Sequence, residues 1–342
     1  MILSILLQII LAIVLVLILL LIAYLVFEKE TVYNSISLKR VTTVFDGIID
    51  FSNIQASYDT LNKYASSYRN LSPSVNQNGG AEYSYNFWIY MDKNKLVSDV
   101  KSSDIVLFLR GNKKVYKYTN DANCQLSNIG KYILVKNPLV RIKSDGSALI
   151  VEYNTLTNPD SYRENGKNKI NCNTKDWNDK NKGLLGIYNM DNSIFDKKWF
   201  MISIILKEIT PTDDIFNKNK TSCKIYINGI NMLERIVESP YNGSTEGSTT
   251  MKHNSAPLYV NPGDIFGDTP DRNPISPELS STLMLADLKY YNYELTEKEL
   301  SSLYSSGFTK ETAKLPSNNG STLDPYQISP NMLNGNNMPI PF

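Results

Sequence analysis

The sequence predicts a mainly β domain with antiparallel strands, carried behind an N-terminal transmembrane helix. Three observations lead to this prediction: an uncharged apolar run from Ile2 to Phe27, an alternation of aromatic and polar residues that begins at Tyr83, and Asp-Gly and Asn-Gly pairs between apolar segments. Alternation with a period of two is typical of strands, because successive side chains point to opposite faces of a sheet. The glycine pairs favour the tight turns of hairpins.

The apolar run is long enough to cross a bilayer. It holds 26 residues, from Ile2 to Phe27. At about 1.5 Å per residue a helix of this length measures about 39 Å, against roughly 30 Å of hydrocarbon. A secretory signal peptide is the alternative, but no Lys or Arg precedes the run, which is longer than a signal peptide's apolar region. We therefore expect a single-pass membrane protein that contacts the lipid bilayer through residues 2–27; the mixed charges after Phe27 leave its orientation open.

The composition excludes several classes of function. All 35 basic and 34 acidic residues follow Phe27, so the remainder is close to neutral and offers no basic patch for nucleic acid. The one histidine is His253, and the three cysteines form no C-x-x-C pair, so no zinc site is expected. Cys124 and Cys172 either form a disulfide or remain thiols. Cys223 alternates with apolar residues, which predicts a buried thiol.

Strand patterns dominate the chain after residue 80. The expected strands are Tyr83–Met91, Ile105–Leu109, Leu139–Ile142, Ala148–Tyr153, Trp199–Leu206, Cys223–Ile227, Leu258–Val260 and Leu283–Tyr291. Asp145-Gly146 predicts a hairpin between the third and fourth of these strands, and Asn228-Gly229 predicts a tight turn after the sixth. Trp88 lies within the first strand, and we expect its side chain and that of Trp199 to lie in the core.

The segments that precede and follow the strands have a different character. Residues 28–79 are expected to form a stalk and a lead-in segment, with a short strand or amphipathic piece near Val41 and weak helical spacing over 59–68. Residues 308–342 are rich in Pro, Asn, Gly and Ser and are expected to form an extended tail without a core of its own.

One helix is predicted after the last strand. Thr296 and Glu299 have the spacing of a capping box, in which each side chain accepts a hydrogen bond from the other residue's backbone amide. The expected helix runs from Thr296 to Ser306, and Gly307 lies where a glycine commonly ends a helix.

Four segments resemble concanavalin A-like, laminin-G-like domains. Ala81–Tyr90 resembles the opening strand of that family, Lys198–Ile205 its central strand, Lys224–Gly229 the following strand and hairpin, and Ala286–Leu300 the closing strand and helix. The resemblance covers residues 80–307, with the long polar stretches as insertions. It implies an antiparallel two-sheet jelly-roll sandwich whose inner faces share one core.

The chain departs from the glucanases of that family in its carboxylates. Glycosidic hydrolysis needs two carboxyl groups that converge on the scissile bond. The expected strands carry only Glu152 and Asp287, one on each of two strands, and no Glu-x-Asp-x-Glu run occurs. We expect Asp287 to accept backbone hydrogen bonds. The sequence therefore predicts a binding or structural module that is not an enzyme and needs no cofactor.

Two loops hold candidate ligand-binding residues. Asp264, Asp268 and Asp271 lie in a Gly- and Pro-rich loop, where their carboxylates would suit calcium. A solvated turn, with Asp chosen for local hydrogen bonds, is the alternative and is favoured because the cluster does not lie on a strand. Trp177 lies in a polar loop and would stack on a sugar ring or a partner protein, or else fix its own loop to the domain.

The remaining indications concern location and partners. Asn70, Asn219, Asn242 and Asn319 begin glycosylation sequons that matter if the domain faces a secretory lumen. The Asn-, Lys-, Tyr- and Ile-rich composition behind a membrane anchor resembles envelope or capsid-associated proteins of large DNA viruses. That resemblance implies a virion protein, of the minor capsid type, that ties an internal membrane to the capsid shell through protein contacts. The alternative is a cell-surface or virion lectin that binds glycans through loop residues.

Overall fold

The computed structural model describes thirteen stretches of the chain. They are residues 14–21, 38–51, 56–75, 81–99, 104–111, 136–153, 161–164, 167–170, 184–190, 195–209, 220–237, 256–262 and 282–316. Contacts along the chain divide it into two units, Met1–Arg40 and Val41–Phe342, and each is described by itself.

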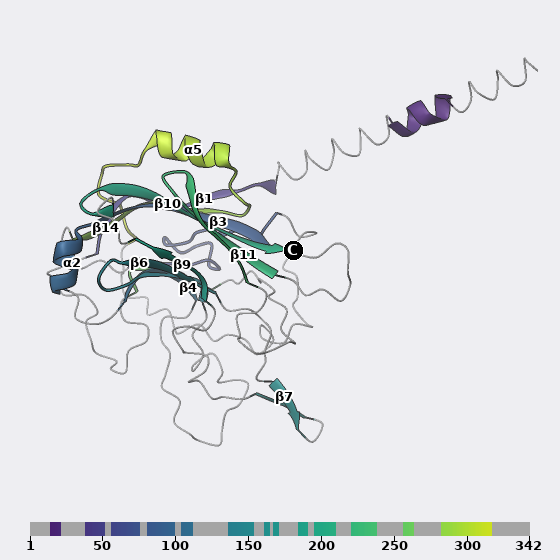
Figure 1. Ribbon diagram of the computed structural model, residues 1–342. Helices are drawn as coiled ribbons and strands as arrows, with labels where there is room; N and C mark the ends of the chain where they lie inside the picture. The colour runs from purple at the N-terminus through teal and green to yellow at the C-terminus, as the bar shows by residue number, and fades with distance from the viewer. Residues whose placement is uncertain are drawn as a thin grey trace, which may run out of the picture. The chain divides into compact units, whose positions relative to one another are not determined.

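The first unit contains a short described helix at residues 14–21, drawn in purple in Figure 1. All of its side chains are apolar, and each exposes between 45% and 62% of its surface. Within the described stretches, no helix has both the length and the hydropathy that a membrane span requires. The rest of the expected span, residues 2–13 and 22–27, lies outside those stretches.

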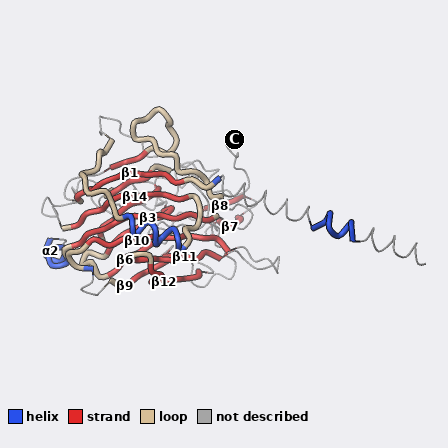
Figure 2. Tube along the Cα trace, turned by 90° about the horizontal axis from the view of Figure 1, so that it is seen from above, coloured by secondary structure: helices blue, strands red, loops and turns tan. Residues whose placement is uncertain are grey.

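The second unit is mainly β, as the sequence predicts, and its described strands form two six-stranded antiparallel sheets and one two-stranded sheet (Figures 1 and 2). Sheet A has the order β1 (Val41–Asp50), β14 (Leu283–Tyr291), β3 (Glu82–Met91), β10 (Trp199–Ile209), β11 (Lys220–Ile227) and β12 (Ile230–Val237). Sheet B has the order β2 (Ala56–Tyr58), β13 (Leu258–Val260), β4 (Ile105–Gly111), β5 (Lys136–Ile142), β6 (Ala148–Glu152) and β9 (Leu184–Asn189). The small sheet pairs β7 (Ser161–Glu164) with β8 (Lys167–Ile170).

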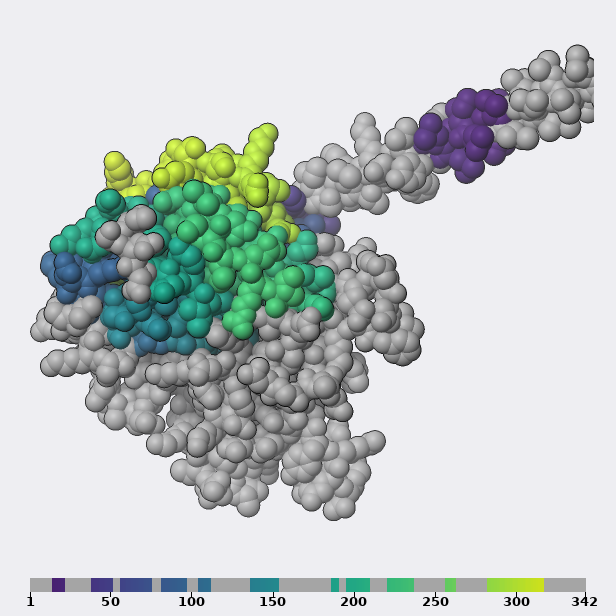
Figure 3. Space-filling model, in the orientation of Figure 1, coloured from purple at the N-terminus to yellow at the C-terminus, as the bar shows by residue number. Residues whose placement is uncertain are grey.

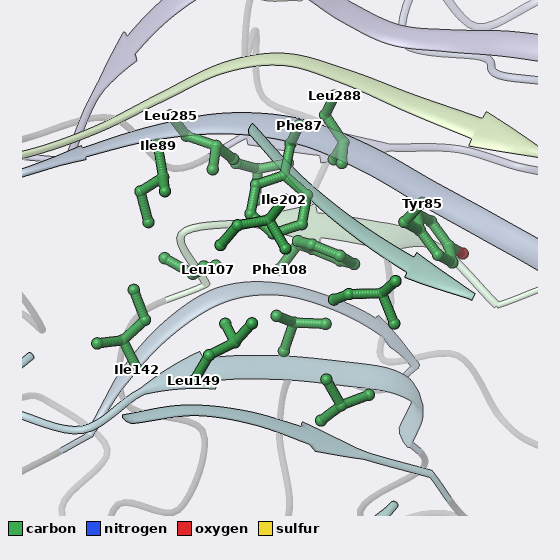
Figure 4. Packing of buried hydrophobic residues seen from close by; sticks show 14 of the residues in the cluster. Tyr85, Phe87, Ile89, Leu107, Phe108, Ile142, Leu149, Ile202, Leu285 and Leu288 are labelled. Atoms are coloured by element: carbon green, nitrogen blue, oxygen red, sulfur yellow. The ribbon is translucent and has the colours of Figure 1, made fainter. Parts of the chain in front are cut away.

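One hydrophobic core lies between sheets A and B. The alternate residues of β3 from Tyr83 to Met91 are buried in it, together with core residues of β4, β5 and β6. In Figure 4, Phe87 and Ile202 of sheet A point toward Leu149 of sheet B. Burial of each large apolar side chain stabilises the fold by about 1.5–3 kcal/mol, which makes the shared core the main force that holds the sheets together.

Both predicted hairpin turns are confirmed. β5 and β6 pair across the Asp145-Gly146 turn, where the Ser147 amide donates to Asp145 Oδ1 at 2.9 Å. Between β11 and β12, Asn228 has φ 52° and Gly229 has φ 82°. Two consecutive positive φ angles match the type I′ turn, whose twist suits a two-residue hairpin.

The predicted closing helix is confirmed as α5 (Glu297–Ser306), and its capping box between Thr296 and Glu299 is complete. α5 covers part of the outer face of sheet A, where Leu300 joins a small cluster with Ile205 and Tyr226. Figure 3 shows this C-terminal region in yellow beside the green strands. Within the second unit, α2 (Lys93–Asp99) is a further described helix and follows β3.

Trp88 is buried as expected, but in a second hydrophobic cluster outside the central core, and the expected burial of Trp199 is met only in part. Trp88 is buried on the outer face of sheet A, where its ring stacks on Tyr304 at 5.8 Å between centroids. Trp199 is only partly buried, and its ring lies 4.5 Å from that of Phe308. Both side chains alternate with core residues, so the pleat turns them away from the central core and toward the helix.

Both sheets include residues from the range 28–79. β1 pairs with β14 along seven register positions, and β2 pairs with β13. Residues 59–68 form turns and not a helix, because Asp59 Oδ1 accepts the amides of Leu61 and Asn62 at 2.7 and 2.9 Å. This local bond favours a turn over helical hydrogen bonding.

Candidate functional site

Most residues that the sequence marked as ligand candidates lie outside the described stretches. These residues are Trp177, Asp264, Asp268, Asp271, Asn219, Asn242, Asn319, Cys124 and Cys172. Asn70 is described and exposed, and its carbonyl accepts the Thr42 hydroxyl. Cys223 is a buried free thiol, as predicted, and burial raises the pKa of this thiol to about 12. Among described residues, no group of three or more His, Cys, Asp or Glu could hold a metal ion.

Glu152 lies at the end of β6 within a buried cluster of four charges. Its Oε2 contacts Lys136 Nζ, and its Oε1 accepts Arg141 Nε at 2.7 Å. Arg141 also meets Asp104. We call Lys136, Arg141, Glu152 and Asp104 the charge cluster. Its carboxylates and cations are equal in number, and the two cations on Glu152 come from the neighbouring strand β5.

The charge cluster lies on the face of sheet B that points away from the core. Val140 and Ile142 belong to the core, so Arg141 between them points to the opposite face. The side chains of Lys136 and Glu152 are nonetheless 0% exposed. Charged side chains are rarely buried this completely on a sheet's outer face. At this place on sheet B, therefore, the charged side chains are buried and paired with one another, and they do not form a solvated polar face.

Asp287 confirms the expectation of backbone hydrogen bonds. It occupies an irregularity of β14 with φ 51°, next to a register shift against β3. Its Oδ1 accepts the Gly47 amide at 2.7 Å, and its Oδ2 accepts the Thr309 amide at 3.0 Å. Asp287 and Glu152 belong to different sheets, and both oxygens of each carboxylate already have partners.

Two further carboxylates lie on strands that are longer than the sequence suggested. β3 begins at Glu82, whose carboxylate lies 3.8 Å from Lys207 Nζ. β10 extends past Glu208, whose Oε2 accepts the Ala81 amide at 3.3 Å. Glu82 alternates with core residues of β3, whereas Glu208 continues the core-facing row of β10. The two carboxylates therefore point to opposite faces of sheet A.

A cluster of buried tyrosines surrounds a buried arginine between the sheets. The rings of Tyr85 and Tyr290 lie 5.2 Å apart, and the Arg110 guanidinium carbon lies 5.8 Å from the Tyr290 ring centre. Tyr290 donates its hydroxyl to Ser72 O at 2.8 Å. Burial raises the pKa of both tyrosines, although Arg110 opposes the rise. These tyrosines stay neutral in the physiological range, and the guanidinium gains cation–π attraction from the Tyr290 ring.

Sequence reasoning missed the buried cations Arg110, Lys136 and Arg141. Arg110 looked like the polar end of a short apolar strand, because a charged residue is normally a boundary. The sequence did contain a signal for the charge cluster. Arg141 and Glu152 have opposite charges and lie on the two strands of a predicted hairpin. Cross-strand pairing of opposite charges is a common source of sheet stability.

Comparisons with known proteins identify no family for this chain. No protein-family model and no curated protein sequence match it. Among solved structures, it is similar to the receptor binding domain of botulinum neurotoxin mosaic serotype C/D, with 12% identity and a TM-score of 0.36, over 78% of this chain and 45% of that one. The botulinum neurotoxin serotype D binding domain has 13% identity and a TM-score of 0.34, over 78% and 46%.

A third structure of this kind is the binding domain of botulinum neurotoxin DC in complex with rat synaptotagmin II. It has 14% identity and a TM-score of 0.33, and the match covers 78% of this chain and 46% of that one. The chain thus spans somewhat less than half of each of these three structures. Its own strand pairing and shared core establish the two-sheet architecture.

Proposed function

We propose that this chain is a membrane-anchored, non-catalytic binding or structural module of concanavalin A-like fold. One observation carries the proposal: the uncharged apolar run 2–27, whose described part at 14–21 is a helix with every apolar side chain exposed. Exposed apolar surface costs roughly 25 cal/mol per Å² in water. A bilayer removes that cost, and the run has the length to span it.

The two carboxylates that the sequence placed on strands, Glu152 and Asp287, support a non-catalytic role. A glycosidase keeps one carboxyl group protonated and a second one free to face the anomeric carbon. Glu152 forms ion pairs with two cations, and Asp287 accepts hydrogen bonds from two backbone amides. Both groups serve the fold. A binding module needs no such pair, and its ligand contacts would come from loops at the ends of the sheets.

In this proposal the partners are other proteins that the domain contacts outside the bilayer. In the virion version, the domain ties an internal membrane to the capsid shell through protein contacts. A lectin that uses Trp177 is the alternative. A glycan array probed with the full-length protein in detergent separates the two, because glycan binding that Trp177→Ala abolishes would favour the lectin.

The anchor itself is tested by extraction at alkaline pH. The full-length protein, expressed with membranes present, should stay in the membrane pellet, whereas a version without Met1–Phe27 should be released as a folded protein. Release of the full-length protein would overturn the proposal. So would a truncated version that still pellets with membranes.

A further inference from the structure

A loop beside the start of β1 presents two apolar side chains to solvent. In this loop, residues 59–69, Tyr64 is 100% exposed and Leu61 is 51% exposed. Lys63 lies between them and is exposed as well. Single exposed apolar residues are common on protein surfaces, so exposure alone marks no site. The loop's internal bonds and its position on the chain add the argument.

The backbone of the 59–69 loop is fixed by hydrogen bonds. The Arg69 amide donates to Asp59 O at 2.7 Å and closes the loop. Asp59 Oδ1 accepts the Leu61 amide at 2.7 Å, and Asn62 Oδ1 accepts the Tyr64 amide at 3.1 Å. The loop therefore holds Leu61 and Tyr64 outward before any partner arrives. A preorganised loop loses little conformational entropy on binding.

The base of the loop is tied to the first residues of the domain. The Thr42 hydroxyl donates to Asn70 O, and Arg69 Nε donates to Val44 O at 2.8 Å. β1 begins at Val41, which is 53% exposed. The loop is therefore bonded to the start of β1, the first strand after the N-terminal segment.

The connection to the apolar run is short. Residues 28–40 are thirteen in number. A chain of that length reaches at most about 43–47 Å when fully extended, at roughly 3.3–3.6 Å per residue. If residues 2–27 span a bilayer, the start of β1 lies within that distance of the membrane surface, and the loop is tied to it.

We propose that the 59–69 loop is a second, interfacial contact with the bilayer that holds residues 2–27. Leu61 and Tyr64 enter the headgroup region, and the Lys63 ammonium faces anionic lipid phosphates. Tyrosine is enriched at this depth because its ring is apolar and its hydroxyl is polar. A lysine near an anionic surface gains electrostatic attraction. This inference rests on the proposed function and specifies which part of the domain faces the membrane.

Photocrosslinking in nanodiscs tests the contact. The full-length protein carries a p-benzoylphenylalanine in place of Tyr64 or, as a matched control, in place of Tyr304, which is 44% exposed on α5. We expect lipid adducts at position 64 to exceed those at position 304 by about fivefold or more, since only a group at headgroup depth meets lipid. Anionic lipid should raise the yield at position 64, and Lys63→Glu should remove that increase.

The outcomes separate this inference from the anchor. Equal yields at the two positions, in protein that resists alkaline extraction, would overturn the loop contact and leave the anchor in place. Protein that is extracted would overturn both. If the adduct yield at position 64 is the same with neutral and with anionic lipid, the proposed contact of Lys63 with anionic lipid is wrong.

Discussion

Glu152 in sheet B and Asp287 in sheet A are both buried carboxylates on strands, but their partners differ in kind. Glu152 is held by the side-chain cations of Lys136 and Arg141. Asp287 is held by the backbone amides of Gly47 and Thr309. The first arrangement fixes one hairpin, β5 with β6. The second joins β1 to β14, which is distant in sequence, and to the residues that follow α5.

The difference shows two ways to keep a charge inside a sandwich. Ion pairing buries further charges, and each of them loses its hydration, so the gain depends on the whole cluster staying together. Backbone amides that donate to Asp287 bury no second charge, and the backbone already holds them in place. Asp287 also positions the C-terminal strap, residues 307–316, whose Glu311 O accepts the Ile48 amide at 2.7 Å. The strap thereby covers part of the β1 edge, which would otherwise be open to pairing with another chain.

The largest effect should come from the charge cluster. Glu152→Gln removes the carboxylate between Lys136 and Arg141 and should lower the free energy of unfolding by about 3–5 kcal/mol, the usual cost of breaking a buried ion pair. Urea denaturation measures this change. The matched control is Glu234→Gln on β12, whose carboxylate is half exposed and lies 3.7 Å from Lys224 Nζ. Equal costs for the two variants would show that the charge cluster is solvated.

Asp287→Ala should have the next largest effect. It removes the acceptor of two backbone amides, and buried hydrogen bonds to a charged group contribute enough that we expect a loss of about 2–3 kcal/mol. The loss should be local as well, with faster hydrogen exchange at Thr309 and across the C-terminal strap than in β5 and β6. Uniform exchange across both sheets would mean that Asp287 does not act through the strap.

The sequence was informative where local pattern decides structure. The alternation in β3, the glycines in the two hairpin turns and the capping box of α5 each act within about ten residues, and all were confirmed. The strand role of residues in 28–79 was harder to predict. β1 pairs with β14, which is more than two hundred residues away, and no local signal reports such a pairing.

The site was less predictable than the fold. Asp287 was correctly assigned to backbone hydrogen bonds, but its donors, Gly47 and Thr309, come together only through the β1–β14 pairing and the strap. Trp88 is buried as expected, but the sequence did not show that it belongs to a second cluster on the outer face of sheet A, under α5. Arg110 shows the same limit, because a buried guanidinium depends on aromatic neighbours from other strands.

Gly47→Ala tests how closely the strap approaches β1. An added Cβ would lie 2.5 Å from Glu311 O, and Gly47 has φ 88°, so the variant is both crowded and strained. We expect a loss of about 1–3 kcal/mol from the backbone conformation, with displacement of the strap in addition. Gly307→Ala is the control, since its φ is 70° and nothing lies within 4 Å of the added atom. A loss no greater than that of Gly307→Ala would place the strap further from β1.

The smallest effect should come from Glu294, a partly buried counterpart of Glu152. Burial alone would raise the pKa of Glu294, but hydrogen bonds from Lys207 and Lys224 lower it below its ordinary value of 4.5. A carboxylate with a lowered folded pKa stabilises the protein above its unfolded pKa, and this contribution is lost as the pH falls through the folded pKa. Because the Glu294 side chain is only partly buried, at 24% exposed, and its two lysine partners are partly exposed as well, we expect Glu294→Gln to cost less than Glu152→Gln, about 1 kcal/mol at neutral pH.

Acid and salt distinguish Glu294 from Glu152. The difference between wild type and Glu294→Gln should disappear as the pH falls below about 4.5, the ordinary pKa of the group, and through its lowered folded pKa. It should also shrink in high salt at neutral pH, because salt screens charges that solvent partly reaches. The cost of Glu152→Gln should persist in the same salt, since buried pairs are screened much less. Urea midpoints of both variants, measured with and without added salt, check this contrast. A Glu152→Gln cost that falls with salt as the Glu294→Gln cost does would mean that solvent reaches Glu152 as it reaches Glu294, and would remove the distinction between the two regions.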